Sequence, residues 1–238
     1  MDKVSVITVC YNAASTIEET IQSVITQDYP ALEYIIIDGG STDQTMSIVE
    51  KYQASIDIII SEPDQGIYNA MNKGLAFATG EWINFMNAGD TYVNNGVLSS
   101  IFSLTISSAV RVIYGDSYFK SNGNTTEIKC RSIDVLSCCM PFCHQSTFVR
   151  KGVIPFDETY KICADYKMFY SLYKALGPSV FLYHPIPISV FDNEGGLSVT
   201  NVKQHRLEVL QIRSFHKDYR WWVDWAKYQV KFNILRLC

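Results

Sequence analysis

Apolar and polar residues alternate in blocks along the first 90 positions of the chain. Short apolar runs have the composition of buried strands, and stretches with an apolar residue at every third or fourth position lie between them. Strands are predicted at residues 4–9, 34–37, 56–60 and 82–86, and helices after residue 15, around Val49 and over residues 67–78. This alternation predicts an α/β fold, in which a mostly parallel, doubly wound sheet carries helices on both faces.

A helix-capping pattern precedes the first predicted helix. Ser15-Thr16-Ile17-Glu18 matches the capping-box pattern, in which a hydroxyl and an acid satisfy the first backbone N–H groups of a helix. Ile17, Ile21, Val24 and Ile25 then share one face of the helix, which predicts that this face packs on the sheet.

The second half of the chain is less regular. Residues 112–115 and 146–149 predict strands, and residues 164–176 predict a helix with apolar positions for the core. Residues 180–183 and 186–191 are expected to pair as a hairpin around Pro185. Residues 192–198 have the composition of a loop, and this loop is a candidate lid over a bound substrate.

Polar residues follow each predicted strand of the first half. These residues are Cys10-Tyr11-Asn12, Asp38, residues 62–66 and residues 87–90. Ligands of parallel sheets bind at the carboxyl ends of the strands. Four such ends on one rim are hard to explain as turns alone, so we expect a binding site there.

Asn87-Ala88-Gly89-Asp90 follows an apolar run directly and carries one carboxylate. A lone acid at the end of a strand is a frequent ligand for a hard cation beside a phosphate. Asn, Gly and Asp also favour surface turns, so this stretch alone leaves both interpretations open. The other three strand ends favour the metal site.

Composition limits the class of protein. With 238 residues, 47% of them apolar and 18% charged, the chain can form one large α/β domain or a domain with a small appendage. We expect no signal peptide, because the start lacks a basic region and a cleavage site, and no apolar run is long enough to span a bilayer.

Seven scattered cysteines indicate reduced, cytosolic thiols. Cys138, Cys139, Cys143 and His144 lack a second cluster that would complete a zinc site.

The charge is unevenly distributed. Residues 1–202 contain 12 Lys and Arg against 21 Asp and Glu, whereas residues 203–238 contain 8 against 3. The acidic body makes nucleic acid a poor candidate partner.

In residues 219–237, Arg220, Asp224, Lys227 and Lys231 recur on one stripe among Trp and aliphatic residues. This pattern is typical of an amphipathic helix in a membrane interface, although a helix docked on the domain or in a dimer contact would share it.

Two common nucleotide motifs are missing. The first strand is followed by Tyr11-Asn12-Ala13-Ala14-Ser15 and not by Gly-x-Gly-x-x-Gly, and no P-loop occurs. A nucleotide would have to bind differently, for example with Tyr11 stacked on the base and Asp38 accepting a ring N–H. Asp38 as a turn or helix-capping residue is at least as good an interpretation of that position alone.

Four segments together resemble glycosyltransferase family 2. They are Val4-Ser5-Val6-Ile7-Thr8-Val9-Cys10-Tyr11-Asn12, Ile37-Asp38-Gly39-Gly40-Ser41-Thr42-Asp43, Gly66-Ile67-Tyr68-Asn69-Ala70-Met71-Asn72-Lys73-Gly74 and Phe85-Met86-Asn87-Ala88-Gly89-Asp90. The resemblance covers residues 1 to about 200, and it is strongest to bacterial members that build surface polysaccharides. It implies a GT-A fold and inverting transfer from a nucleotide-diphosphate sugar.

The resemblance also implies roles for individual residues. Residues implied to contact the nucleotide sugar are Thr8, Tyr11, Asn12, Asp38, Asp64, Asn72 and Asn87. Asp90 matches the carboxylate that binds Mn²⁺ or Mg²⁺ on the donor diphosphate. The family usually has a further Asp one or two positions earlier, and Ala88 and Gly89 supply none, so a single acid would hold the ion together with water and phosphate.

The catalytic base is implied in the second half. Asp165 matches the family's base at the start of a helix, with Ala164 where many members have Glu. An acid in the first turn of a helix also has a plain explanation, since it stabilises the helix dipole. His144 and Gln145 match a polar pair that faces the acceptor, and His144 is the second candidate for the base.

These observations predict an inverting glycosyltransferase at the cytoplasmic face of the plasma membrane. The expected donor is a UDP-hexose, and the expected acceptor is a polyprenyl-diphosphate-linked saccharide in polysaccharide or O-antigen biosynthesis. Residues 1–202 would form the GT-A domain, with a nucleotide-sugar half (1–116) and an acceptor half (117–202), and residues 203–238 a basic helical region. A nucleotidyltransferase and a non-catalytic sugar-nucleotide or glycan-binding protein are the alternatives.

Overall fold

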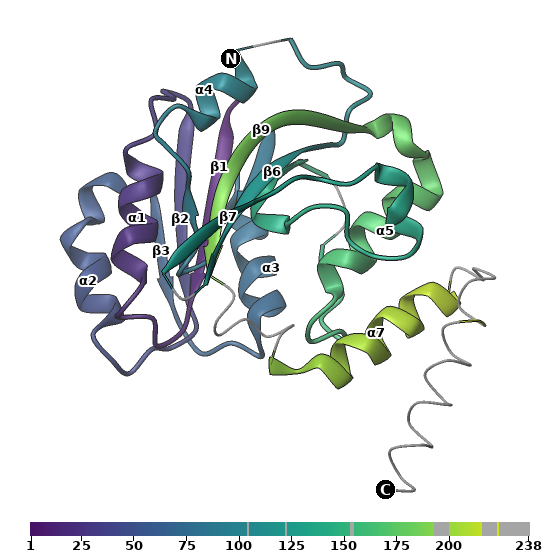
Figure 1. The fold of residues 1–238 in the computed structure, drawn as a ribbon. Helices are drawn as coiled ribbons and strands as arrows, with labels where there is room; N and C mark the ends of the chain where they lie inside the picture. The colour runs from purple at the N-terminus through teal and green to yellow at the C-terminus, as the bar shows by residue number, and fades with distance from the viewer. Residues whose placement is uncertain (104, 122, 153–154, 193–199, 216–222, 224–238) are drawn as a thin grey trace, which may run out of the picture.

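The computed structural model of the chain describes residues 1–103, 105–121, 123–152, 155–192, 200–215 and 223 (Figure 1). Its strands are β1 (Val4–Cys10), β2 (Leu32–Asp38), β3 (Ile58–Ser61), β4 (Trp82–Phe85), β5 (Thr91–Tyr92), β6 (Val112–Ser121), β7 (Asn124–Ile128), β8 (Thr147–Arg150) and β9 (Phe181–Asp192). Its α-helices are α1 (Ile17–Ile25), α2 (Thr45–Lys51), α3 (Ile67–Phe77), α4 (Val97–Phe102), α5 (Ala164–Leu176) and α7 (Val202–Phe215). Short 3₁₀ helices lie at Gln53–Ser55, Ile133–Ser137, His144–Ser146 and Pro178–Val180.

All nine strands belong to one sheet, with the order β3-β2-β1-β4-β8-β6-β9-β5 and β7 paired to β6. In the first half, β1 pairs in parallel with β2 and β4, and β2 pairs in parallel with β3, as the strand–helix alternation predicts. In the second half, β8 runs antiparallel between β4 and β6, while β6 and β9 are parallel. The sheet is therefore mixed, and its parallel part coincides with the regular half of the sequence.

Helices cover both faces of the sheet, as predicted (Figure 1). Alternate residues of β1 point to opposite sides: Ile7 and Val9 pack with α3 and α5, whereas Val4 and Val6 pack with α1, α2 and α4. The two hydrophobic cores that result lie one on each face of the sheet. This alternation follows from the two-residue period of a strand, and it explains why strands buried on both faces have continuous apolar runs.

The structure corrects two predictions about local structure. Residues 181–192 do not form a hairpin around Pro185, because β9 is one strand that pairs in parallel with β6. The register shifts at Gly115 and Asp116 of β6, and the two prolines of β9 lie at this irregularity, where a missing N–H is tolerated. The prediction of a capping box at residues 15–18 is also wrong, because α1 begins after Thr16 and the Thr16 side chain makes no capping hydrogen bond.

Helix α4 and strands β5 and β7 were not anticipated. In α4, Val97, Leu98, Ile101 and Phe102 are buried at helical spacing, a signal that the sequence does contain. Strand β5 has only two residues and β7 is exposed along its whole length, so neither carries an apolar pattern long enough to recognise.

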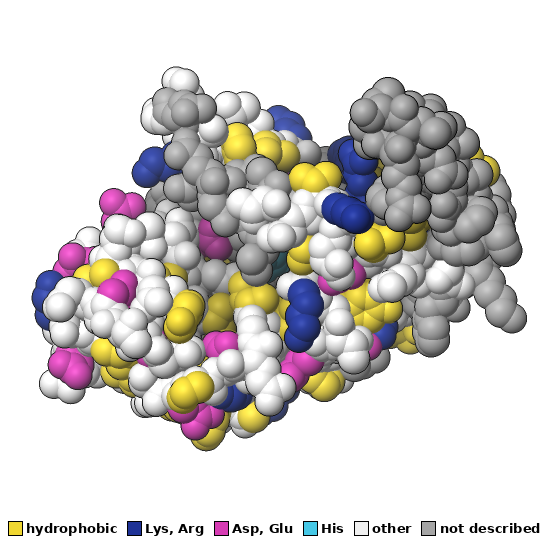
Figure 2. Space-filling model, turned by 90° about the horizontal axis from the view of Figure 1, so that it is seen from below, with side chains coloured by type: hydrophobic (Ala, Val, Ile, Leu, Met, Phe, Trp, Pro, Cys, Tyr) yellow, Lys and Arg dark blue, Asp and Glu magenta, His cyan; other side chains and the backbone are white. Residues whose placement is uncertain are grey.

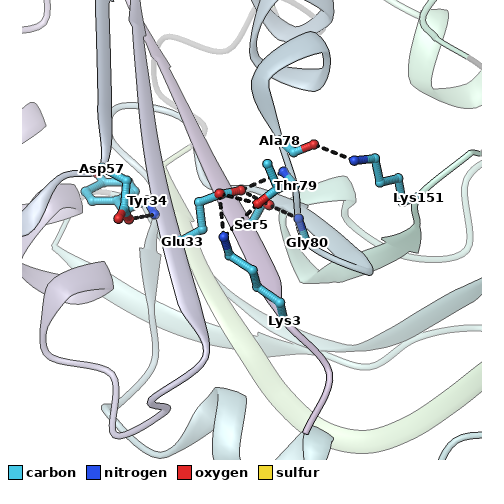
Figure 3. A network of polar contacts seen from close by, with 9 residues as sticks. All are labelled: Lys3, Ser5, Glu33, Tyr34, Asp57, Ala78, Thr79, Gly80 and Lys151. Carbon is cyan, nitrogen blue, oxygen red and sulfur yellow. Dashed lines mark hydrogen bonds and ion pairs between the residues drawn. The ribbon is translucent and has the colours of Figure 1, made fainter.

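Polar contacts join three segments at the amino end of the sheet (Figure 3). The buried carboxylate of Glu33 accepts hydrogen bonds from Lys3 Nζ (2.7 Å), Ser5 Oγ (2.5 Å), Thr79 Oγ1 (2.5 Å) and the backbone N–H of Thr79 (2.7 Å). The Ser5 hydroxyl in turn accepts the N–H of Gly80 at 2.8 Å. A Cβ at Gly80 would lie 2.6 Å from the Ser5 nitrogen, so the close approach requires glycine. The network fixes the turn between α3 and β4 against β1 and β2.

Candidate active site

A cavity of about 870 Å³ opens on the side of the sheet where β1 and β4 end. Figure 2 looks onto that side and shows a hollow near its centre, with hydrophobic and acidic side chains around it. Among the residues that line the cavity are Asn87, Asp90, His144, Gln145 and Asp165. The fold therefore brings the predicted metal ligand, acceptor pair and base into one space, although as many as 78 positions separate them in the sequence.

Asp90 and Asn87 lie on a tight turn after β4. The N–H of Asp90 donates to the carbonyl of Asn87 at 2.9 Å, and Gly89 takes a positive φ of 101°. Both residues are more than nine-tenths buried. Two consecutive residues from the second half of the chain contact them: Gln145 Nε2 donates to Asp90 Oδ2 (2.9 Å), and His144 Nε2 lies 3.2 Å from Asn87 Nδ2. The pair at 144–145 thus places an amide and a carboxylate side by side.

One atom of this group has no hydrogen-bond partner within the described residues. It is Asn87 Oδ1, which is buried beside the cavity. A carbonyl oxygen and a carboxylate are the donor types that Mg²⁺ and Mn²⁺ prefer, so the residues present fit a divalent cation. Within the described part of the chain, no group of three or more His, Cys, Asp or Glu residues could hold a metal.

Asp165 belongs to a chain of polar contacts. Its Oδ2 lies 3.5 Å from His144 Nδ1, and its Oδ1 accepts the hydroxyl of Tyr68 (3.1 Å) and the N–H of Tyr166 (2.7 Å). Burial alone would raise the pKa of Asp165, but His144 and these donors outweigh it and hold that pKa below its ordinary value. Conversely, burial lowers the pKa of His144, and the nearby Asp165 outweighs this effect and raises it. Asp165 is therefore ionised at neutral pH, as a base must be.

A second group of predicted residues gathers where β1 and β2 end. Asp38 is completely buried and accepts hydrogen bonds from the hydroxyls of Ser41 and Ser61 and from the N–H groups of Gly40 and Ser41. Burial raises its pKa, but these four donors outweigh the burial and lower it, so the carboxylate stays charged. This dense set of donors is also how a structural loop residue would be held.

Tyr11 and Asp64 lie close to each other around Gly39. A Cβ on Gly39 would meet Asp64 Oδ2 at 2.3 Å and Tyr11 Cδ2 at 3.5 Å, so both side chains lie directly against this glycine. The Tyr11 side chain is 64% exposed, which leaves its ring accessible for stacking. Asn12, with a positive φ of 49°, lines the cavity and accepts the N–H of Thr42 through Oδ1 at 2.9 Å.

Five predicted residues do not line the cavity: Thr8, Tyr11, Asp38, Asp64 and Asn72. Two of them, Thr8 and Asn72, have contacts within the fold. The Thr8 hydroxyl is buried between strands, where it donates to the carbonyl of Met86 (2.7 Å) and lies 3.0 Å from the Tyr34 hydroxyl. Asn72 exchanges hydrogen bonds with the backbone of Phe156 and donates to Glu158 at 2.8 Å. Asn72 thereby ties α3 to the loop before α5, a role that its place on a helix did not indicate.

The structure adds residues that the sequence did not indicate. Tyr68 contacts Asp165 directly, while its ring packs in the hydrophobic core on that face of the sheet. His205 and Val209 of α7, together with Lys161, form part of the cavity wall. The predicted boundary at residue 202 therefore coincides with the start of a helix that lines the cavity. Leu210 and Ile212 of the same helix are buried.

Two predictions fall outside the described residues. The amphipathic segment 219–237 has only Val223 described, and the candidate lid at 192–198 has only the backbone of Asp192 described. Among the described helices, none has the length and apolar character needed to cross a bilayer.

Comparisons with known proteins give a consistent result. The family model "Glycosyl transferase family 2" matches residues 5–169, well over half of the chain. A Mycobacterium tuberculosis glycosyltransferase of PGL/p-HBAD biosynthesis is 28% identical over 217 residues, which are 87% of this chain and 84% of the relative. TuaG of Bacillus subtilis, named for teichuronic acid biosynthesis, is 39% identical over 92 residues, 37% of this chain and 36% of TuaG.

Solved structures share the fold. Residues 1–349 of Staphylococcus aureus TarS, in complex with UDP, superpose with a TM-score of 0.69 at 20% identity, covering 90% of this chain. The chain spans 64% of that TarS fragment, slightly less than two thirds. Glucosyl-3-phosphoglycerate synthase of M. tuberculosis, in complex with Mn²⁺, UDP-glucose and phosphoglyceric acid, has a TM-score of 0.62 at 16% identity and covers 89% of this chain and 79% of the synthase.

Proposed function

Because the chain belongs to glycosyl transferase family 2, we propose that it transfers a hexose from a UDP donor to a lipid-linked saccharide with inversion at the anomeric carbon. As a family 2 glycosyltransferase it is an enzyme, which sets aside the nucleotidyltransferase and the non-catalytic binding protein. One observation carries the proposal: Asp90 with Asn87 and Asp165 with His144 line the same cavity. An inverting transfer needs a site for the leaving diphosphate and a base for the acceptor within one such space.

We assign the donor to the strand ends. Tyr11 and Asp38 would hold the nucleobase, with Asp64 beside them, and the diphosphate would reach Asp90 past Asn12 at the cavity wall. A divalent cation held by Asp90 and the carbonyl oxygen of Asn87 would neutralise the negative charge that develops on the leaving diphosphate. TarS with UDP and the synthase with UDP-glucose and Mn²⁺ support this choice of donor and ion.

We assign the base to Asp165. Its ionised carboxylate would take the proton of the acceptor hydroxyl as the oxygen attacks the sugar, while the bond to the diphosphate breaks on the opposite side. His144 contacts Asp165 through Nδ1 and would keep the carboxylate oriented and charged, and Gln145 holds Asp90. Tyr68 fixes the other oxygen of the base.

The acceptor class rests on the cavity wall and on the relatives. Around Asp165 the wall contains apolar residues, among them Met140, Phe142 and Ile162, and beside them the basic or titratable residues Lys161 and His205. An amphiphile with an anionic head and an apolar chain suits such a wall. Relatives named for PGL/p-HBAD and teichuronic acid biosynthesis also support a product of the polysaccharide type. We therefore place the enzyme peripherally on the cytoplasmic face of the membrane.

The donor and the reaction are tested together. Purified protein is screened by thermal shift against UDP-, GDP- and dTDP-sugars with Mn²⁺, because a ligand of the native state raises its apparent stability. We expect stabilisation by a UDP-hexose and by UDP, followed by transfer to a short polyprenyl-diphosphate saccharide with inverted linkage. Stabilisation by GDP-sugars alone would overturn the donor assignment, and a retained anomeric configuration would overturn the mechanism.

The membrane assignment needs a separate test in the full-length chain. Lys227→Glu with Lys231→Glu should reduce flotation with anionic liposomes, because each basic residue near such a surface contributes about 1 kcal/mol. The matched control, Lys120→Glu with Lys129→Glu, changes the same charge elsewhere in the chain. Equal flotation of both double variants and the wild type would contradict a role of residues 219–237.

A further inference from the structure

Glu208 of α7 is a buried carboxylate to which the proposed mechanism gives no role. Its side chain is 1% exposed, although the helix lies close to the end of the described chain. Oε1 accepts the backbone N–H of Lys161 at 2.9 Å, and Oε2 accepts the N–H groups of Ile162 and Cys163, both at 2.9 Å. Gln204, one turn earlier on α7, donates to Oε1 at 2.9 Å.

These three N–H groups immediately precede α5. The residue at the helix start, Cys163, makes no side-chain capping bond, and its own N–H is one of the three. The first N–H groups of a helix have no partner within the helix, and a negative charge near them is favourable. Glu208 therefore holds the backbone that leads into α5, from 45 positions further along the chain.

The segment that Glu208 holds is also the segment that positions the base. Asp165 is the second residue of α5, two positions after Cys163. The Tyr68 hydroxyl donates to the carbonyl of Ile162 in the same segment at 2.6 Å and lies 3.1 Å from Asp165 Oδ1. Ile162 is thus held by Glu208 through its N–H and by Tyr68 through its carbonyl.

We propose that Glu208 is a positioning residue for the transfer reaction: its three hydrogen bonds to residues 161–163 set the place of Asp165 in the cavity. The inference rests on the proposed role of Asp165. With this role for Glu208, α7 contributes to the active site, and two further residues of α7, His205 and Val209, line the cavity.

The test compares two buried glutamates in the full-length protein. Glu208→Gln keeps the size of the side chain but removes the charge, and Glu33→Gln makes the same change in the network at the other end of the sheet. We expect Glu208→Gln to lower kcat about 10- to 100-fold, since small displacements of a catalytic group have effects of this size. The KM for the donor and the affinity for UDP should stay within about twofold. Glu33→Gln should leave kcat unchanged.

A second measurement does not depend on transfer activity. Hydrogen exchange at the amides of residues 161–163 should be at least about tenfold faster in Glu208→Gln than in the wild type, and unchanged in Glu33→Gln. If the wild type transfers no sugar, the proposed function fails while this measurement still tests the contact. A wild-type kcat in Glu208→Gln, or a loss shared equally by Glu33→Gln, would overturn the inference.

A third variant covers the case in which Glu208→Gln does not fold. Glu208→Asp keeps the charge but is one methylene shorter, so it loses part of the contact with residues 161–163. We expect an intermediate kcat with unchanged UDP affinity, and a wild-type kcat would likewise overturn the inference.

Discussion

The two ends of the sheet carry polar clusters of similar burial but opposite character. At the amino end, Glu33 binds four donors, and the hydroxyl that bridges it to Gly80 is bonded in both directions. At the carboxyl end, Asn87 Oδ1 is buried without a partner in the described residues, and His144 and Asp165 face each other across 3.5 Å beside an open cavity. A polar cluster with every bond made stabilises a fold, whereas one with unused capacity beside a cavity is available for a ligand.

The contrast predicts that the carboxyl end controls activity and the amino end controls stability. The largest effect should come from Asp165→Asn, because the amide cannot accept the acceptor's proton. We expect kcat to fall about 10³-fold while UDP affinity stays the same. Steady-state kinetics and UDP binding measure both quantities, with the exposed Asp28→Asn as a control. Near-normal turnover would mean that His144 or another group is the base.

Asp90→Asn should have the next largest effect. The change keeps the shape of the side chain and removes its charge, so Mn²⁺ binding should weaken and kcat/KM should fall about 10²-fold. Electron paramagnetic resonance of Mn²⁺ with UDP reports the binding without reference to activity. Full activity of the wild type after treatment with EDTA would remove the metal role from Asp90.

At the amino end, Glu33→Gln should destabilise the fold by about 2 kcal/mol, since hydrogen bonds to a charged group are lost in a buried site. Denaturant unfolding gives this difference, and kcat of the folded enzyme should not change. A drop in kcat with unaltered stability would contradict the division between the two ends.

A smaller effect is expected at Asn87. Asn87→Ala removes the unpartnered oxygen and should weaken Mn²⁺ binding in the presence of UDP about tenfold, whereas Asn87→Asp adds a charged ligand and should strengthen it. Titration of Mn²⁺ followed by its resonance signal compares the two variants with the wild type. If neither variant shifts the affinity, Asn87 contacts the sugar or serves only to hold His144.

The last prediction concerns pH and the amino-end cluster. Burial would raise the pKa of Glu33, but its donors outweigh burial and lower that pKa to about 2. A carboxyl whose pKa is lowered by folding contributes stability above its unfolded pKa and loses it as the pH falls towards the folded pKa. The stability difference between wild type and Glu33→Gln should therefore be constant from about pH 5 to 8 and shrink below about pH 4.5. A difference that is the same at pH 3 and pH 7 would refute this account.

The regular half of the fold was predictable because each of its elements carries a local signal. Apolar runs at β1, β2 and β4 mark strands buried on both faces, and the polar residues that end them must meet at one rim of a parallel sheet. The course of β9 was not predictable from its two prolines, because only the irregular register with β6 makes room for them.

By itself, the sequence determined the family, the α/β architecture and the residue types at the rim, since all three depend on short motifs and on periodicity. Only the tertiary structure decided which of these residues share a cavity. It directed Thr8 and Asn72 to contacts within the fold, left the oxygen of Asn87 without a partner among the described residues and brought His144 to Asp165. It also placed Glu208 at the start of α5. Such contacts join positions far apart in the chain, and their geometry follows from how the helices and strands pack, which no local pattern encodes.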